Sequence, residues 1–240
     1  MSKIIIPARL ESKRLPRKPL VEINGNPMII MTAQNAIKAI GQENVFVATD
    51  SKEIVRICSL NNVNCLLTSN DCLTGTDRVI EAAKKLSFKS FYNLQGDEPL
   101  FPSEVIRNFI NQTIDSEYPV DIGITKIKNL NELKSSKIPK IVFNNQKELL
   151  YTSRSNIPGS KKMDSKIGYK QVCIYKYNIE KLKDYSQFKE KTFFENIEDL
   201  ELLRMLEIGI KVKCRYLDYQ EHFSVDTQED LENLKNYLNK

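Results

Sequence analysis

Short apolar segments alternate with helix-like segments through the first half of the chain, and this alternation limits the fold more than any other feature. Segments of strand length are expected at residues 3–7, 44–48, 63–67 and 91–94. Apolar residues at helical spacing predict helices at residues 27–39, 52–61, 77–85 and 103–112, the last capped by Ser103. Because strands that alternate with helices build parallel sheets, we predict an α/β fold, a mostly parallel sheet flanked by helices.

The second half of the chain has a different pattern. Residues 120–185 are typical of strands joined by turns, which indicates a β-rich extension carried on the sheet. Residues 193–208 predict one helix and residues 211–217 a strand. A terminal helix follows Asp226, where Thr227 and Asp230 resemble a capping box. Because no repeat or low-complexity linker occurs, we predict a single domain over residues 1–240.

The composition argues against several classes of protein. The chain has 240 residues with 36 basic and 31 acidic side chains, and the net charge of +5 suits an anionic substrate without requiring nucleic acid. No apolar run approaches the roughly 18 residues of a transmembrane helix, and the N-terminal apolar run is too short for a signal peptide. The five cysteines form no CxxC pair, which argues against a disulfide framework or a zinc site. We therefore expect a cytoplasmic protein.

Three candidate motifs follow predicted strands. The first is the basic loop PARLESKRLPRKPL at residues 7–20, the second is Thr49-Asp50, and the third is QGDEP at residues 95–99. Ligands of parallel sheets bind outside the carboxyl ends of the strands. We therefore expect all three motifs at one edge of the sheet.

The basic loop has two interpretations from its residues alone. Its cations are Arg9, Lys13, Arg14, Arg17 and Lys18. They could surround a polyphosphate together with backbone N–H groups, or they could form a solvated basic turn. The loop lacks the GxxxxGK[ST] pattern, so a Walker-type phosphate site is not indicated.

Two aspartates are candidates for holding Mg²⁺. Asp97 and Asp226 each follow a strand and precede a turn or a helix. Mg²⁺ prefers carboxylate and phosphate oxygens, so the pair could place one ion between protein and nucleotide. The alternative is that each aspartate only forms a turn or caps a helix.

Other charged residues give weaker indications. The spacing of Glu195, Glu198 and Glu201 predicts that they lie near one helix face, with Glu201 solvated. Arg78 and Arg154 could pair with substrate anions or with surface carboxylates. His222 is the only histidine, which excludes a multi-histidine metal site and argues against a Ser-His-Asp triad.

A series of motifs occurs in one order over almost the whole chain: IIIPARLESKRLPRKPL, NGNPMI, VATD, GTDR, NLQGDEP, LLYTSRSNIP, IEDLELLR and VDTQEDLE. Together they resemble the 3-deoxy-manno-octulosonate (Kdo) cytidylyltransferases. The resemblance implies a nucleotide-diphospho-sugar transferase type of sheet, with a dimer interface in the β-rich extension. It also implies that CMP passes from CTP to Kdo with Mg²⁺ as cofactor, for lipopolysaccharide or capsule synthesis.

The resemblance assigns roles to individual residues. It predicts that CTP is bound by Pro7, Ala8, Arg9, Ser12, Arg14, Lys18, Thr49, Asp50, Gly75, Thr76 and Arg78. It predicts that the sugar acid is bound by Gln95, Arg154, Gln171 and Glu198. It places the metal on Asp97 and Asp226, and catalysis on Arg14, Lys18 and Asp97.

The sequence departs from the family pattern at a few positions. Arg17 replaces a glycine of the first loop, and Thr152 stands where an aromatic residue is common. Gln171 and Cys173 replace a histidine and a glycine of the sugar-acid site. Another 2-keto-3-deoxy acid, such as 8-amino-Kdo or a nonulosonic acid, is therefore an alternative substrate, although Glu98 favours Kdo. A non-catalytic nucleotide-sugar binder is the other alternative.

Overall fold

The computed structural model describes residues 2–12, 14–159, 161, 168–219 and 223–239. Lys13 of the basic loop and the single histidine, His222, lie outside the described residues. The strands are β1 (Ile4–Ala8), β2 (Glu22–Ile23), β3 (Asn26–Pro27), β4 (Val45–Thr49), β5 (Asn64–Leu67), β6 (Ser90–Leu94), β7 (Val120–Lys126), β8 (Lys140–Phe143), β9 (Leu149–Ser153), β10 (Tyr169–Asn178) and β11 (Val212–Tyr216).

Helices connect most of these strands. The α-helices are α1 (Met28–Ile40), α2 (Lys52–Leu60), α3 (Gly75–Lys85), α4 (Ser103–Thr113), α5 (Leu130–Lys134), α6 (Phe193–Glu198), α7 (Glu201–Glu207) and α8 (Gln228–Leu238). Short 3₁₀ helices are η1 (Lys18–Leu20), η2 (Gln42–Asn44), η3 (Ile179–Leu182) and η4 (Tyr185–Gln187). Every helix in the described part of the chain is too short or too polar to cross a membrane.

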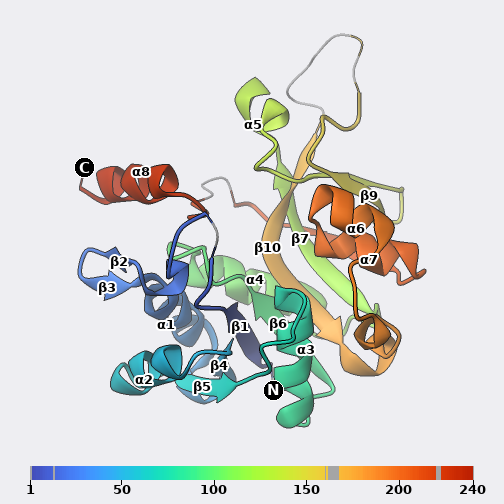
Figure 1. Cartoon of the computed structure of the whole chain (residues 1–240). Helices are drawn as coiled ribbons and strands as arrows, with labels where there is room; N and C mark the ends of the chain where they lie inside the picture. Colours follow the sequence, from blue (N-terminus) through green and yellow to red (C-terminus); the bar gives the residue numbers. More distant parts are fainter. Residues whose placement is uncertain (1, 13, 160, 162–167, 220–222, 240) are drawn as a thin grey trace.

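One sheet of nine strands organises the molecule, in the order β11-β7-β10-β6-β1-β4-β5 with β8 and β9 attached beside β10 (Figure 1). The strand β10 is antiparallel to both of its neighbours on this path, β6 and β7. The other neighbouring strands along the path pair in parallel. The prediction of a mostly parallel α/β sheet is therefore confirmed, although the carboxyl end of β10 lies at the opposite edge from those of the other strands on this path.

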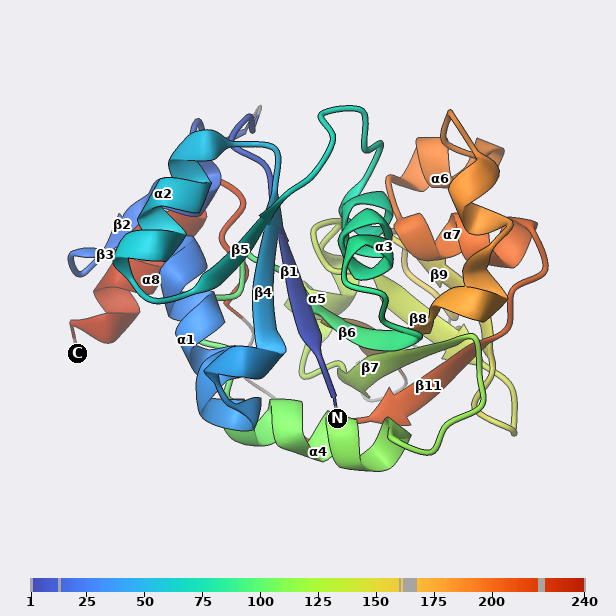
Figure 2. The same ribbon diagram turned by 90° about the horizontal axis from the view of Figure 1, so that it is seen from below.

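The two faces of the sheet bury different helices. On β1, Ile4 and Ile6 pack with residues of α1, α2 and α4, whereas Ile5 packs with residues of α3 and α7. Figure 2 shows α1 and α2 on one side of β1 and β4, and α3 on the other. Both faces are covered, which explains why β1 is a continuous apolar run instead of an alternating one.

A smaller apolar cluster attaches the basic loop to the end of the chain. Leu15 of the loop and Ile23 of β2 pack with Val225, Leu231 and Leu234 of the C-terminal segment. The loop is therefore held between the sheet edge and α8.

Two sequence-based expectations about helices were wrong. Residues 193–208 form two helices, because Asp199 adopts a left-handed backbone with φ 51° between α6 and α7. The helix at residues 103–113 is capped by Pro102, without a side-chain hydrogen bond, so Ser103 is its first residue instead of its cap. The β-rich extension also contains α5, which Asn129 caps by accepting a hydrogen bond from the N–H of Glu132.

The predicted capping box at the start of α8 is confirmed. Thr227 Oγ1 accepts from the N–H of Asp230, and Asp230 Oδ2 accepts from the N–H of Thr227 at 2.9 Å. Burial alone would raise the pKa of Asp230, but the hydrogen bonds from Thr227 and Lys137 outweigh it and the pKa is lowered. Asp230 therefore stabilises the fold above the pKa of an unfolded aspartate.

We expect Asp230→Ala to lower the free energy of unfolding by about 1 kcal/mol at pH 7, the usual cost of a lost cap. Because the folded pKa is lowered, the difference from the parent should begin to shrink as pH falls below about 4 and be lost as pH falls through the lowered pKa. Urea unfolding at several pH values measures both effects. Glu229→Ala, at an exposed neighbouring position of the same helix, is the control; an equal loss there would contradict the prediction.

Candidate active site

The first predicted loop meets the two predicted metal-binding aspartates. Lys18 Nζ lies 2.8 Å from Asp97 Oδ2 and 2.9 Å from Asp226 Oδ1, and Arg14 Nη2 lies 3.0 Å from the same Asp226 oxygen. All four side chains are thus brought together, although they come from positions far apart in the sequence. The structure places this cluster at the carboxyl ends of β1 and β6.

Close backbone contacts hold the cluster in place. A Cβ atom on Gly96 would lie 2.8 Å from the carbonyl oxygen of Pro7, so only glycine allows the two strand ends to approach this closely. The carbonyl of Asp97 accepts a hydrogen bond from the N–H of Val225 at 2.9 Å. This bond brings Asp226 beside Asp97.

The electrostatics of the cluster keep Lys18 charged. Burial alone would lower the pKa of Lys18, but the charges and hydrogen bonds of Asp97 and Asp226 outweigh it, and the pKa is raised. Lys18 therefore remains an ammonium group throughout the physiological pH range and can meet an anion.

The departure at Arg17 has a structural explanation. Arg17 adopts φ 55°, in the left-handed region that glycine favours. Its guanidinium pairs with Glu53 of α2. The side chain therefore reaches outward to α2, while Arg14 and Lys18 face the aspartates.

The second predicted nucleotide segment surrounds the start of α3. Thr74 caps the helix by accepting from the N–H of Asp77. Arg78 is 3% exposed and donates to Asp50 Oδ2 and to Thr68 Oγ1, each at 2.6 Å. Arg78 thus links α3 to Asp50 at the end of β4. Sequence analysis considered a substrate anion or a protein carboxylate as the partner of Arg78, and the structure shows the carboxylate of Asp50.

Glu201 was expected to be solvated, and this was wrong. Its carboxylate accepts from the N–H groups of Gly75 at 3.1 Å and Thr76 at 3.0 Å, and from the hydroxyl of Thr76. Burial raises the pKa of Glu201, and the hydrogen bonds from Thr76 and Gly75 oppose that increase without cancelling it. The left-handed turn at Asp199 also separates Glu201 from Glu195 and Glu198, so the three glutamates do not share one helix face.

The predicted sugar-side residues form a second group on the β-rich extension. Glu198 accepts from Ser153 Oγ at 2.6 Å and from the N–H of Arg154 at 2.8 Å. The guanidinium of Arg154 donates to the backbone carbonyls of Glu198 at 2.6 Å, Ser136 at 3.0 Å and Asp199 at 3.2 Å. The structure therefore brings together Arg154 and Glu198, the two residues that the family resemblance assigns to the sugar acid.

Gln95 and Gln171 are linked through β10. The N–H of Gln95 donates to the carbonyl of Cys173 at 3.2 Å. Gln171 is 8% exposed and donates to the hydroxyl of Tyr175 across a bulge in β10.

Burial raises the pKa of the Cys173 thiol well above its usual value, and the charges of Glu98 and Asp97 raise it further. Cys173 is therefore an uncharged side chain at neutral pH.

The remaining predicted nucleotide residues lie around the end of β1 and β4. Pro7 is half-buried and Ala8 is buried at the end of β1, whereas Arg9 is exposed and Ser12 is half-buried in the loop that follows. Thr49 is buried, and its hydroxyl accepts from the N–H of Ser51 at 3.1 Å. The Thr49 side chain therefore shapes the turn that presents Asp50.

The chemistry of the donor set fits Mg²⁺. Within the described residues, no group of three or more His, Cys, Asp or Glu side chains is close enough to hold a metal alone. Asp97 and Asp226 nevertheless converge on one cation, the ammonium of Lys18. Mg²⁺ is commonly bound by one or two carboxylates together with substrate phosphates, which is the arrangement that these residues allow.

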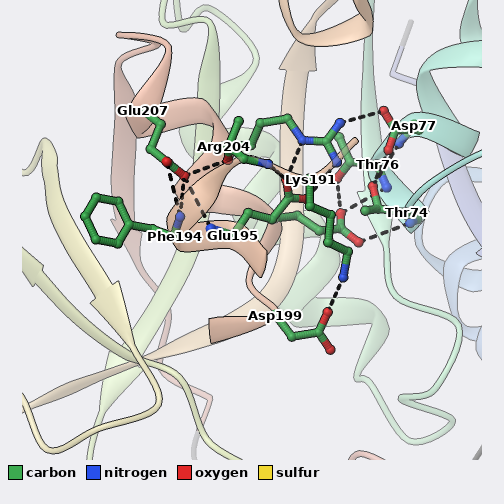
Figure 3. Close-up of polar contacts among 12 residues, drawn as sticks. Thr74, Thr76, Asp77, Lys191, Phe194, Glu195, Asp199, Arg204 and Glu207 are labelled. Carbon is green, nitrogen blue, oxygen red and sulfur yellow. Dashed lines mark hydrogen bonds and ion pairs between the residues drawn. The ribbon is translucent and has the colours of Figure 1, made fainter. Parts of the chain in front are cut away.

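Sequence analysis gave no role in the site to the side chains that connect the two groups. Arg204, Glu195 and Asp77 form an ion cluster in which Arg204 and Glu195 are buried (Figure 3). Glu201 lies beside this cluster, since it accepts a hydrogen bond from the N–H of Thr76, the residue before Asp77. Lys140, which is fully buried, donates to the carbonyl of Arg154 at 2.8 Å. The sequence did contain a sign of these buried charges: a charged residue within an apolar segment. Arg204 stands in ELLRML, and Lys140 directly precedes IVF.

Comparison with known proteins identifies the family. A sequence model of the cytidylyltransferases matches residues 3–213. The chain is 38% identical to 3-deoxy-manno-octulosonate cytidylyltransferase of Polynucleobacter asymbioticus, with 98% of this chain and 94% of that protein aligned. It is 34% identical to the protein of the same name in Acinetobacter baumannii, with 98% and 97% aligned.

Solved structures agree with the sequence comparison. The structure of a CMP:2-keto-3-deoxy-manno-octonic acid synthetase complexed with CTP superposes with a TM-score of 0.89 at 32% identity, covering 99% of this chain and 98% of that one. HddC from Yersinia pseudotuberculosis has a TM-score of 0.72 at 14% identity, covers 99% of this chain and all of that one, and shares the fold alone. The chain is a cytidylyltransferase and belongs to the family of the 3-deoxy-manno-octulosonate cytidylyltransferases.

Proposed function

We propose that this enzyme transfers CMP from CTP to the anomeric hydroxyl of Kdo, releasing pyrophosphate. The observation that carries the proposal is the convergence of Arg14 and Lys18 with Asp97 and Asp226 at the sheet edge. The relatives named for this reaction support the choice of CTP and Kdo as substrates.

The basic loop would bind the triphosphate. Lys18 keeps its charge because its pKa is raised, and Arg14 is exposed and able to move toward a phosphate. An arriving triphosphate competes with the aspartates for these cations. The loop therefore exchanges an internal ion pair for a substrate contact, which limits the cost of desolvating its charges.

Asp97 and Asp226 would hold the Mg²⁺ cofactor that the family resemblance implies. When bound, the ion would neutralise phosphate charge and stabilise the leaving pyrophosphate. Lys18, which pairs with both carboxylates in the structure, would turn to the triphosphate when the ion is bound and contribute its own positive charge to the same region.

The second group of residues would orient the sugar acid. Arg154 and Glu198 are fixed by hydrogen bonds to each other, and Gln171 lies on β10 near Gln95. Gln171 can donate and accept hydrogen bonds but cannot carry charge. Because Gln171 is neutral, the carboxylate of the sugar acid would be recognised by nearby cations and N–H groups instead.

The reaction needs positioning more than covalent chemistry. The C2 hydroxyl of Kdo attacks the α-phosphorus of CTP, the bond to the bridging oxygen breaks, and pyrophosphate leaves in line. Both substrates are anions, so Arg14 and Lys18 must offset their repulsion before they meet. The carboxylate of Asp97 could also favour deprotonation of the attacking hydroxyl.

Pyrophosphate release with CTP, Mg²⁺ and a panel of sugar acids tests the proposal. The panel holds Kdo, 8-amino-Kdo and N-acetylneuraminate, because Gln171 and Cys173 alter the sugar-acid side. We expect release with Kdo. Release with another acid alone would reassign the substrate, and CTP binding without release from any acid would favour a non-catalytic binder.

We further propose a homodimer whose interface includes the β-rich extension at residues 120–185. An exposed aromatic cluster beside the extension supports it: Phe193 of α6 is 70% exposed and contacts Phe194, which in turn contacts Tyr151 of β9 within the extension. The continuity of the sheet from β5 to β11 supports one domain. The free state of all five cysteines supports a cytoplasmic location. We assign the product to lipopolysaccharide or capsule synthesis, as the family resemblance implies.

A further inference from the structure

A single segment of the chain contacts both groups of predicted substrate residues. Glu198, at the end of α6, accepts from Ser153 at 2.6 Å and from the N–H of Arg154 at 2.8 Å on the sugar side. Glu201, at the start of α7, accepts from Gly75 and Thr76 on the nucleotide side. In a continuous helix these two acids would lie near one face. The left-handed turn at Asp199 directs them to opposite partners instead.

Arg204 fixes this segment to the rest of the protein. It is fully buried and pairs with both carboxylate oxygens of Glu195 at 2.7 Å, which joins α7 to α6. Its third contact is Asp77 of α3 at 3.0 Å, one residue after Thr76. Tyr185 covers the guanidinium at 4.3 Å from the ring centre. Figure 3 shows Arg204 between Glu195 and Asp77, with Thr74 and Thr76 beside Asp77.

We propose that Arg204 is a positioning residue, and that the segment it fixes, residues 193–207, makes the binding of CTP and of the sugar acid mutually dependent. A nucleotide that orders the start of α3 also orders Glu201 and, through Arg204, the whole segment. Glu198 and Arg154 are then already placed when the sugar acid arrives, so less conformational freedom is lost in the second step. The effect must be reciprocal, because it is a free energy shared between two sites.

This inference rests on the proposed function, and binding measurements test it without turnover. α,β-Methylene-CTP cannot release pyrophosphate, so calorimetry can measure the affinity for the sugar acid with and without it. The acid used is whichever one supports pyrophosphate release with CTP. We expect the analogue to tighten binding of the acid by about 10-fold in the parent protein, within the usual range of coupling energies.

Asp77→Asn is the test variant, because removing Arg204 itself could prevent folding. The substitution keeps the size of the side chain and removes one of the two charges that Arg204 pairs with. We expect the tightening to fall below about 2-fold, while the affinity for the analogue alone changes by less than about 3-fold. KM for the sugar acid should rise, with kcat at saturation nearly unchanged.

Asp121→Asn is the matched control. Asp121 is fully buried and pairs with Arg215 at 2.7 Å, on β7 and β11, outside the segment and outside the predicted site. It should lower the melting temperature at least as much as Asp77→Asn and leave the tightening at its parent value. Arg204→Lys, which keeps the charge without the two-point contact to Glu195, should give intermediate tightening.

The outcomes separate this inference from the proposed function. Pyrophosphate release with no tightening in the parent, or unchanged tightening in folded Asp77→Asn, would overturn the inference and leave the reaction intact. Equal loss of tightening in Asp121→Asn would also overturn it, since the effect would then follow from stability alone. No release with any acid would overturn both.

Discussion

Asp97→Asn should reduce kcat by about 1,000-fold or more while CTP still binds with an affinity within a few-fold of the parent. The substitution removes one of two carboxylates that converge on Lys18, and with it half of the proposed metal site. Arg14, Lys18 and Arg78 remain, so the contacts proposed for the nucleotide are retained. Steady-state pyrophosphate release gives kcat, and calorimetry with CTP gives the affinity.

A surface aspartate provides the control for this change. Asp115→Asn alters an exposed carboxylate just beyond α4 and should leave both kcat and CTP affinity at parent values. If Asp97→Asn kept more than about a tenth of parent turnover, Asp97 would have no role in holding the metal or in favouring deprotonation. A parallel loss of CTP binding would instead indicate that the loop had collapsed.

Arg204→Met should strongly destabilise the folded protein. It leaves the buried carboxylate of Glu195 without its partner and removes a contact to Asp77. Breaking a buried ion pair at one end costs about 3–5 kcal/mol, which lowers the melting temperature by about 10 °C in a chain of this size. Thermal unfolding followed by circular dichroism measures the shift.

Two further variants show whether the unpaired charge is the cause. Arg204→Met combined with Glu195→Met removes both partners and should regain part of the lost stability, because apolar groups of similar size can replace a buried pair. Arg107→Met removes an exposed arginine whose contact is to the carbonyl of Lys38, and should change the melting temperature by less than about 2 °C. If Arg107→Met lowered the melting temperature as much as Arg204→Met, burial of the ion pair would not be the cause of the destabilisation.

The parts of the fold that local pattern controls could be predicted from the sequence. The alternation of strands and helices before residue 113, the β-rich extension and the capping box at Thr227 all depend on neighbouring residues. The meeting of Lys18 of the basic loop with Asp97 could be expected because parallel strands end at one sheet edge. The strand expected before Asp226 is absent from the described residues there, and Asp226 is brought to the site by the hydrogen bond from the N–H of Val225 to the carbonyl of Asp97. The antiparallel direction of β10 could not be predicted, because it depends on distant pairing with β6 and β7.

The errors in the site had one physical origin. Helical periodicity in residues 193–208 gave no warning of the left-handed residue Asp199, so Glu198 and Glu201 were placed on one face. A carboxylate that accepts hydrogen bonds from distant backbone N–H groups looks, in sequence, like any solvated glutamate. Glu201 and Arg204 could be recognised only once α3 and α7 were seen side by side.

The first loop has a consequence for the entropy of binding. Pro7, Pro16 and Pro19 restrict its backbone, and Arg17 ties it to Glu53 of α2. Leu15 packs against the cluster that supports α8. Much of the conformational freedom that a flexible phosphate-binding loop would lose on meeting its ligand is therefore already lost on folding. If this loop binds the nucleotide as proposed, the nucleotide meets a loop whose shape is set in advance, so little of its binding energy is spent on ordering the loop itself.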